Sequence, residues 1–116
     1  MGVVLRILLR LAGPCLLLVG VPTMASAQGD PERGRGLYGV CATCHGDSGQ
    51  GMADMNGPRL AGREPWYLRR QLQNFKSGAR GSDERDIYGR QMAPMAQLLQ
   101  DDQAIADVVA YITSLE

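Results

Sequence analysis

The sequence predicts an all-α domain in which a few helices are joined by long loops. The clearest helix lies near the C-terminus, where four apolar residues recur at helical spacing: Ile105, Val108, Val109 and Ile112. Two earlier helices each begin at a proline, Pro31 and Pro65, a residue favoured at the first helical position. No stretch alternates apolar and polar residues convincingly, so a sheet is not expected.

The first predicted helix runs from Pro31 to about Val40 and places Cys41 at its C-terminal end. Asp30 precedes it as an N-cap, and Glu32 adds an acidic side chain to its first turn.

Three glycines weaken this helix: Gly34, Gly36 and Gly39. Each costs about 0.8–1 kcal/mol relative to alanine. Close approach of another backbone would explain such a cost, so we expect a second helix to cross here.

The remaining chain alternates loops and helices. Residues 46–62 are rich in Gly, Asp, Asn and Pro and are expected to form an irregular loop. The helix that begins at Pro65 has one buried face, formed by Leu68, Leu72 and Phe75, and ends at Ser77-Gly78. Residues 77–91 are expected to form a polar loop with one short helical turn, and Asp101 or Asp102 caps the last helix.

Residues 1–27 have the features of a cleaved secretory signal peptide. Arg6 and Arg10 are their only charges, and Ala25-Ser26-Ala27 supplies the small residues that a signal peptidase accepts. The apolar run, residues 11–21, is about half of the roughly 20 residues that a membrane-spanning helix needs. We therefore expect export to the periplasm, with no stable membrane insertion after cleavage.

Residues 28–116 form the one expected domain and carry ten basic and twelve acidic side chains, a net charge of −2. This balance argues against nucleic acid as a partner. Aromatic residues make up only 5% of the chain. Because a small domain buries a modest fraction of its surface, we expect a cofactor to complete the core.

The segment CATCHG, residues 41–46, contains two cysteines and the only histidine. A structural zinc site needs four ligands, usually as two separated pairs, and the chain has no second cluster. A thioredoxin-like dithiol belongs to a βαβ framework that this chain lacks. A disulfide between Cys41 and Cys44 would close a loop too small to constrain the chain much.

The remaining interpretation is covalent haem attachment, for which Cys-x-x-Cys-His is the known spacing. Two cysteines three positions apart near a helix end can both reach the vinyl groups on one porphyrin edge. The next residue, His45, then points at the iron from the same side. We expect one haem c, bound through Cys41 and Cys44 with His45 as an axial ligand, and no catalytic residue.

The second axial ligand is expected to be a methionine, because the chain has no other histidine. Met52 and Met55 follow the motif too closely, in a loop that should turn away beneath the histidine side. Met92 and Met95 lie far enough along the chain to reach the opposite face. Met92 is preferred, since Pro94 disfavours helix at the residue before it and the ligand is expected on an extended segment.

The chain resembles the class I cytochromes c, especially the short bacterial monohaem type that is similar to one half of a diheme c-four cytochrome. The resemblance extends over nearly all of residues 28–116. It rests on GDPERGRGLYGVCATCHG, GPRLAG, WYLRRQLQNFKSGAR and MAPMAQLLQDDQAIADVVAYI, in that order. It implies the class I cytochrome c fold, with three to five helices around one haem and the N- and C-terminal helices crossing.

The resemblance also implies residue roles. Counted back from Tyr111, Met92 matches the ligand position of the family better than Met95, which would line the haem cavity. The backbone carbonyl of Pro58 would accept the other N–H of His45.

Gly34 and Tyr38 would face Tyr111 where the terminal helices cross. Four residues are candidate donors to the haem propionates: Trp66, Tyr67, Arg69 and Arg70. The alternative is that they form only a solvated basic face.

A haem with two protein ligands predicts a one-electron carrier with redox protein partners. The alternative is a haem subunit that accepts electrons from a separate catalytic dehydrogenase subunit. An enzyme or gas sensor would need five-coordinate iron, and Met92 and Met95 argue against it.

Overall fold

The structure, a computed structural model, describes residues 28–115. Its helices are α1 (Pro31–His45), the 3-10 helix η1 (Ala53–Met55), α2 (Pro65–Ser77), α3 (Ile87–Gln97) and α4 (Asp102–Thr113). Within the described residues the only β-type pairing is an isolated bridge in the loop after α1. The all-α prediction is confirmed, whereas the predicted signal peptide lies outside the described residues. No helix in residues 28–115 is long and apolar enough to cross a membrane.

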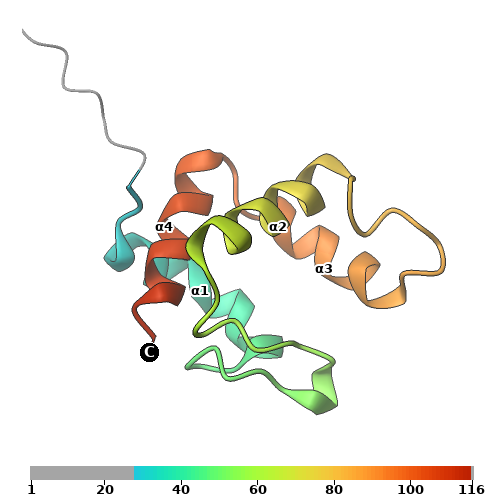
Figure 1. The fold of residues 1–116 in the computed structure, drawn as a ribbon, viewed down its shortest axis with the longest axis horizontal. Helices are drawn as coiled ribbons and strands as arrows, with labels where there is room; N and C mark the ends of the chain where they lie inside the picture. Colours follow the sequence, from blue (N-terminus) through green and yellow to red (C-terminus); the bar gives the residue numbers. More distant parts are fainter. Residues whose placement is uncertain (1–27, 116) are drawn as a thin grey trace, which may run out of the picture.

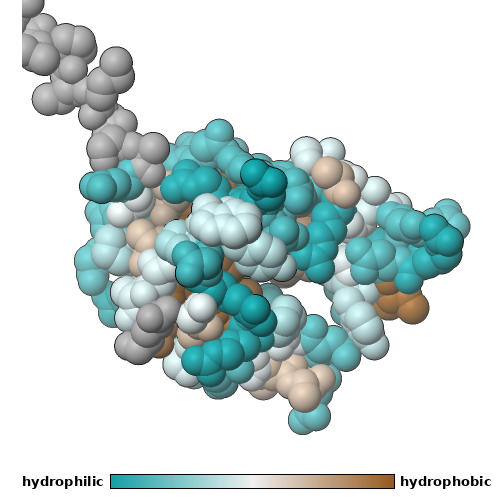
Figure 2. All heavy atoms as spheres, in the orientation of Figure 1, coloured by the Kyte–Doolittle hydropathy of each residue, from teal (hydrophilic) through white to brown (hydrophobic). Residues whose placement is uncertain are grey.

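The helices pack in the order α1, α4, α2, α3 (Figure 1). α1 and α4 pack against each other, and α2 packs against both α4 and α3. The loop that follows α1 and the helix α3 extend from this core on different sides. Figure 2 shows an opening between these two extensions, on the face where the surface is otherwise largely hydrophilic.

α1 begins where the sequence predicts but ends later. The Asp30 side chain accepts hydrogen bonds from two backbone N–H groups of the first turn, at 2.8 and 3.3 Å. The expected end near Val40 is wrong, because α1 continues to His45. Residues 41–45 contain no glycine or proline to stop a helix. The helix ends instead at Gly46, which has a φ of 83°.

α1 and α4 cross at Gly34. A Cβ atom at this position would overlap the carbonyl oxygen of Asp107 and lie 2.8 Å from the Cβ of Tyr111. One turn further along α1, the ring of Tyr38 packs on that of Tyr111 with centroids 5.2 Å apart. The predicted crossing of the terminal helices is confirmed, and a side chain at Gly34 would force the two helices apart.

A buried carboxylate joins the same two helices. Asp107 on α4 is 3% exposed. It accepts hydrogen bonds from Arg33 Nε at 2.8 Å, the Asp30 backbone N–H at 2.7 Å and Gln103 Nε2 at 2.9 Å. These donors, Arg33 above all, hold the pKa of Asp107 well below its usual range. No pattern in the sequence predicted this role for Asp107.

The apolar core is formed mainly by α4, with contributions from α1, α2 and the turn before α4. Its buried members are Tyr38, Leu68, Leu99, Ile105, Val108, Val109 and Ile112. Of the two possible caps of α4, Asp101 has the capping role, because its side chain accepts from the Ala104 N–H at 2.8 Å. The apolar stripe predicted for the last helix is therefore its buried face.

α2 has the predicted bounds and ends at Gly78, which is left-handed with a φ of 78°. Its last turn is joined to the corner between α3 and α4. Lys76 Nζ donates to the carbonyl oxygen of Leu99, and Gln97 Nε2 donates to the carbonyl oxygen of Lys76 at 3.0 Å.

α3 differs from the prediction. Residues 87–91 were expected in a polar loop and Ala93 in an extended segment, but both lie in a helix that contains Pro94. The Asp86 side chain caps this helix by accepting from a backbone N–H at 2.9 Å. Its buried side packs against α2. Capping and packing thus outweigh the backbone hydrogen bond that Pro94 cannot donate.

Replacing Gly34 with alanine should lower the free energy of unfolding by about 2–3 kcal/mol, because the new Cβ separates α1 from α4. Gly36→Ala is the control, since a Cβ there meets no atom of the described chain within 4 Å. It should raise the free energy of unfolding by about 0.4–1 kcal/mol. Chemical denaturation of the haem-loaded protein measures both, and equal effects would contradict the role given to Gly34.

Asp107→Asn should lower the free energy of unfolding at pH 7 by about 1–2 kcal/mol, because the variant loses charge-assisted bonds to a partly exposed Arg33. The folded pKa of Asp107 is depressed, so the charge stabilises the fold above the unfolded pKa of about 3.9. The difference between wild type and variant should therefore shrink as the pH falls below about 4. Glu32→Gln should change stability by less than about 0.5 kcal/mol, since Glu32 pairs with Arg35 on the surface. A difference that persists undiminished at pH 2 would show that the charge is not the cause.

Candidate functional site

The two cysteines and the histidine of the motif occupy the last turns of α1. Cys41 and Cys44 are three positions apart, which places their side chains on the same side of the helix. Both are half-buried free thiols. Burial raises the pKa of Cys41 to about 11, so this thiol is neutral at neutral pH.

His45 is buried, with 6% of its surface exposed. Its Nδ1 lies 2.7 Å from the backbone carbonyl oxygen of Pro58. Because a carbonyl only accepts, this contact requires the proton on Nδ1. In the neutral imidazole the lone pair is then on Nε2, which is the nitrogen available to a metal ion.

The loop after α1 reaches His45 by packing against the end of that helix. A Cβ atom at Gly57 would overlap the carbonyl oxygen of Cys44, so only glycine allows this approach. The Gly51 N–H donates to the carbonyl oxygen of His45 at 2.8 Å. Gly57 was not predicted to have this role, although it directly precedes Pro58 in the sequence.

Tyr38 links this loop to the helix crossing. Its hydroxyl donates to the carbonyl oxygen of Gly46 at 2.8 Å. Burial raises the pKa of Tyr38 to about 12, so the hydroxyl keeps its proton. Further along the loop, the carbonyl oxygen of Gly49 accepts from the N–H groups of Leu60 and Ala61 at 2.8 and 3.0 Å.

The four methionines of the described residues lie in two places. Met52 and Met55 are exposed in the loop after α1. Met92 and Met95 lie three positions apart on α3 and are therefore neighbours on its surface. Met92 is half-buried, whereas Met95 is 42% exposed. Burial therefore distinguishes Met92 from Met95. The extended segment expected for the ligand is a helix in the structure, so it does not distinguish them.

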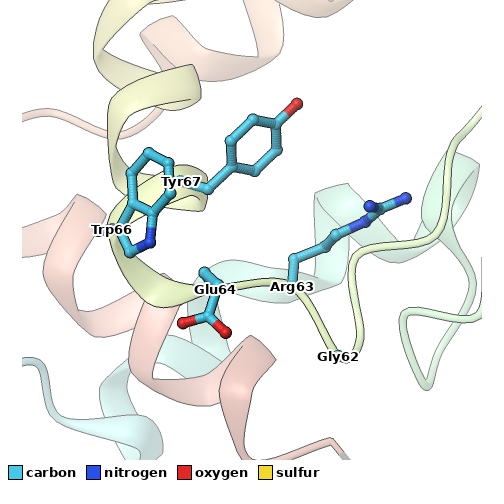
Figure 3. Close-up of a pocket in the computed structure, with 5 residues that line it drawn as sticks. All are labelled: Gly62, Arg63, Glu64, Trp66 and Tyr67. Carbon is cyan, nitrogen blue, oxygen red and sulfur yellow. The ribbon is translucent and has the colours of Figure 1, made fainter.

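The start of α2 carries the aromatic residues considered as propionate donors. Trp66 and Tyr67 line an open hollow with Gly62, Arg63 and Glu64 (Figure 3). The guanidinium of Arg63 and the hydroxyl of Tyr67 extend to the same side, and Trp66 points away from them. The hollow adds Arg63 to the candidate donors.

The donor set fits one haem c. Two free thiols on one helix side match two vinyl groups, and the oriented His45 presents an imidazole nitrogen beside them. Two methionines lie on α3, a helix separate from the motif, and a thioether is one of the ligands that haem iron accepts. Within residues 28–115 no cluster of three or more His, Cys, Asp or Glu side chains is placed to hold a metal ion, so zinc gains no support.

An all-α domain with crossing terminal helices and Cys-x-x-Cys-His at the end of the first helix defines a class I c-type cytochrome. The family model described as Cytochrome c matches residues 31–116, and the chain belongs to this family. It therefore carries a covalently bound c-type haem.

Three relatives define what the chain is similar to. It is 40% identical over 101 residues to cytochrome c4 of Stutzerimonas stutzeri, covering 85% of this chain and 47% of the relative. It is 38% identical over 88 residues to cytochrome c-554(548) of Halomonas halodenitrificans, covering 76% of this chain and 99% of the relative. It is 44% identical over 64 residues to the thiosulfate dehydrogenase electron acceptor of S. stutzeri strain A1501, covering 55% of this chain and 26% of the relative. The chain spans about half the length of the cytochrome c4 it matches.

Replacing both Cys41 and Cys44 with alanine should abolish covalent attachment, because each thiol is expected to form one of the two bonds to the cofactor. The measurement is haem staining after denaturing electrophoresis. Wild-type protein should keep its haem under these conditions. Haem that extracts into acidic organic solvent from the unmodified protein would contradict the assignment.

Proposed function

We propose that this chain is an exported one-electron carrier whose iron is ligated by His45 and Met92. The observation that carries the proposal is the contact between His45 Nδ1 and the Pro58 carbonyl oxygen. A histidine ligand whose second nitrogen is held by a carbonyl has a fixed tautomer and ring orientation. Such a ligand suits a permanent bond to iron.

Met92 is the proposed second ligand because it is the less exposed methionine of α3 and lies on a helix separate from the motif. The haem supplies a one-electron couple when bound. Residues on both axial sides keep water and small ligands from the iron, and a thioether ligand raises the potential compared with a second imidazole. The protein accordingly acts by burying and orienting the cofactor, not by catalysis.

Export rests on the sequence. The features of residues 1–27 are those of a signal peptide cleaved after Ala27, which would leave residues 28–116 as a monohaem domain in the periplasm.

The second candidate function is the electron-accepting subunit of a dehydrogenase complex. It is favoured by the similarity to a thiosulfate dehydrogenase electron acceptor over 64 residues. A permanent subunit would elute from a size-exclusion column with a larger partner, whereas a free carrier would elute alone. Co-elution of this protein with a larger partner, after purification from native extract under mild conditions, would favour the subunit function.

Met92→Ala should open the iron. In the ferric wild type we expect the weak charge-transfer band at the red end of the visible spectrum that accompanies iron–thioether bonding, and in the ferrous protein no carbon monoxide binding at neutral pH. Met92→Ala should lose the band, lower the potential and bind carbon monoxide. Optical spectra with and without carbon monoxide measure the band and the binding, and a redox titration without carbon monoxide measures the potential.

Met95→Ala is the matched control on the same helix. It should keep the band, and because Met95 is partly exposed, it should cost less stability than the roughly 2–5 kcal/mol of a fully buried methionine. If Met95→Ala alone removes the band, the ligand assignment is reversed. If wild-type ferrous protein binds carbon monoxide quickly, the carrier function is wrong.

A further inference from the structure

The charges of residues 28–116 are unevenly distributed. Residues 59–70 carry four arginines and one carboxylate, a net charge of +3: Arg59, Arg63, Arg69, Arg70 and Glu64. The rest of residues 28–116 carries six basic and eleven acidic side chains, a net charge of −5. One short segment therefore has the opposite sign to the rest of the domain.

This segment is exposed and contains the residue types that dominate protein interfaces. Trp66 is 61% exposed and Tyr67 is 40% exposed. The guanidinium of Arg70 lies 6.0 Å from the centre of the Trp66 ring, and the two aromatic rings meet edge to face at 5.9 Å. Tryptophan, tyrosine and arginine are the side chains most enriched at binding hot spots. The hollow in Figure 3 lies among them.

The segment also begins beside the cofactor ligand. Arg59 directly follows Pro58, whose carbonyl oxygen contacts His45 Nδ1. A partner that binds at Arg59 therefore docks next to the backbone that holds His45, the expected haem ligand. Electron exchange between proteins requires this proximity.

We propose that the Arg59–Arg70 surface is the docking surface for an acidic redox partner protein. The inference rests on the proposed electron-carrier function. The exposed side chains of Arg59, Arg63 and Arg70 pair with carboxylates of the partner, and Trp66 provides an apolar contact. The positive surface also steers an acidic partner to the cofactor although the domain as a whole is negative.

The sign of the salt dependence tests the proposal. The probe is hexacyanoferrate(III), a trianion that takes one electron from the ferrous haem and becomes hexacyanoferrate(II). A domain with net charge −2 repels this anion, so its overall charge predicts a rate that rises with salt. The docking surface predicts the reverse: stopped-flow oxidation of the haem-loaded protein should slow as ionic strength rises from about 0.01 to 0.3 M.

Arg70→Glu should lower the low-salt rate about three- to tenfold and remove or reverse its salt dependence. Arg85→Glu is the matched control, because it makes the same change of net charge in the exposed loop before α3, at the far end of the molecule in Figure 1. It should change the rate much less. If Arg70→Glu folds poorly, Arg70→Gln should show the same direction with a smaller effect.

Equal effects of the Arg70 and Arg85 variants, or a wild-type rate that rises with salt, would overturn the docking surface. So would cosedimentation with phosphatidylglycerol vesicles that Arg70→Glu abolishes, since the surface would then bind lipid. A protein that hexacyanoferrate does not oxidise at all would instead overturn the electron-carrier function.

Discussion

The contact between α1 and α4 at Gly34 determines the arrangement of the whole domain. The helix backbones approach closely because Gly34 has no side chain, and Asp107 joins them with a buried carboxylate whose donors come from both helices. This crossing fixes the direction of α1 and therefore the position of the motif at its end. α2 packs on α4, and α3 packs on α2. The position of α3, which carries Met92, therefore also depends on the contact between α1 and α4.

Local signals in the sequence predicted the start of α1 and both ends of α2. Asp30, Pro65 and Gly78 act through neighbouring backbone groups and have the predicted roles, and Asp101 is the cap among the two residues considered for α4. The error at α3 concerns a segment where tertiary packing outweighs local preference. Pro94 disfavours a helix locally, but α3 forms around it because it is capped and packs on α2.

The candidate site was predictable to the extent that it is contiguous. The motif lies within five residues, and the contact of His45 with Pro58 followed from the resemblance to a family. The contacts that hold the loop could not be predicted, because Gly57 and Tyr38 have structural roles defined by distant backbone carbonyls. The basic surface was only partly recognised, since its meaning depends on the acidic remainder of the domain and on which side chains are exposed.

Tyr38 belongs to the helix crossing and to the loop at once. Its ring packs on Tyr111, and its hydroxyl bonds to the carbonyl oxygen of Gly46. The loop therefore cannot open without disturbing the core, and the two form one cooperative unit. The amide protons of Gly51 and Ala61, which are hydrogen-bonded within the loop, consequently exchange with solvent only as rarely as the core itself unfolds.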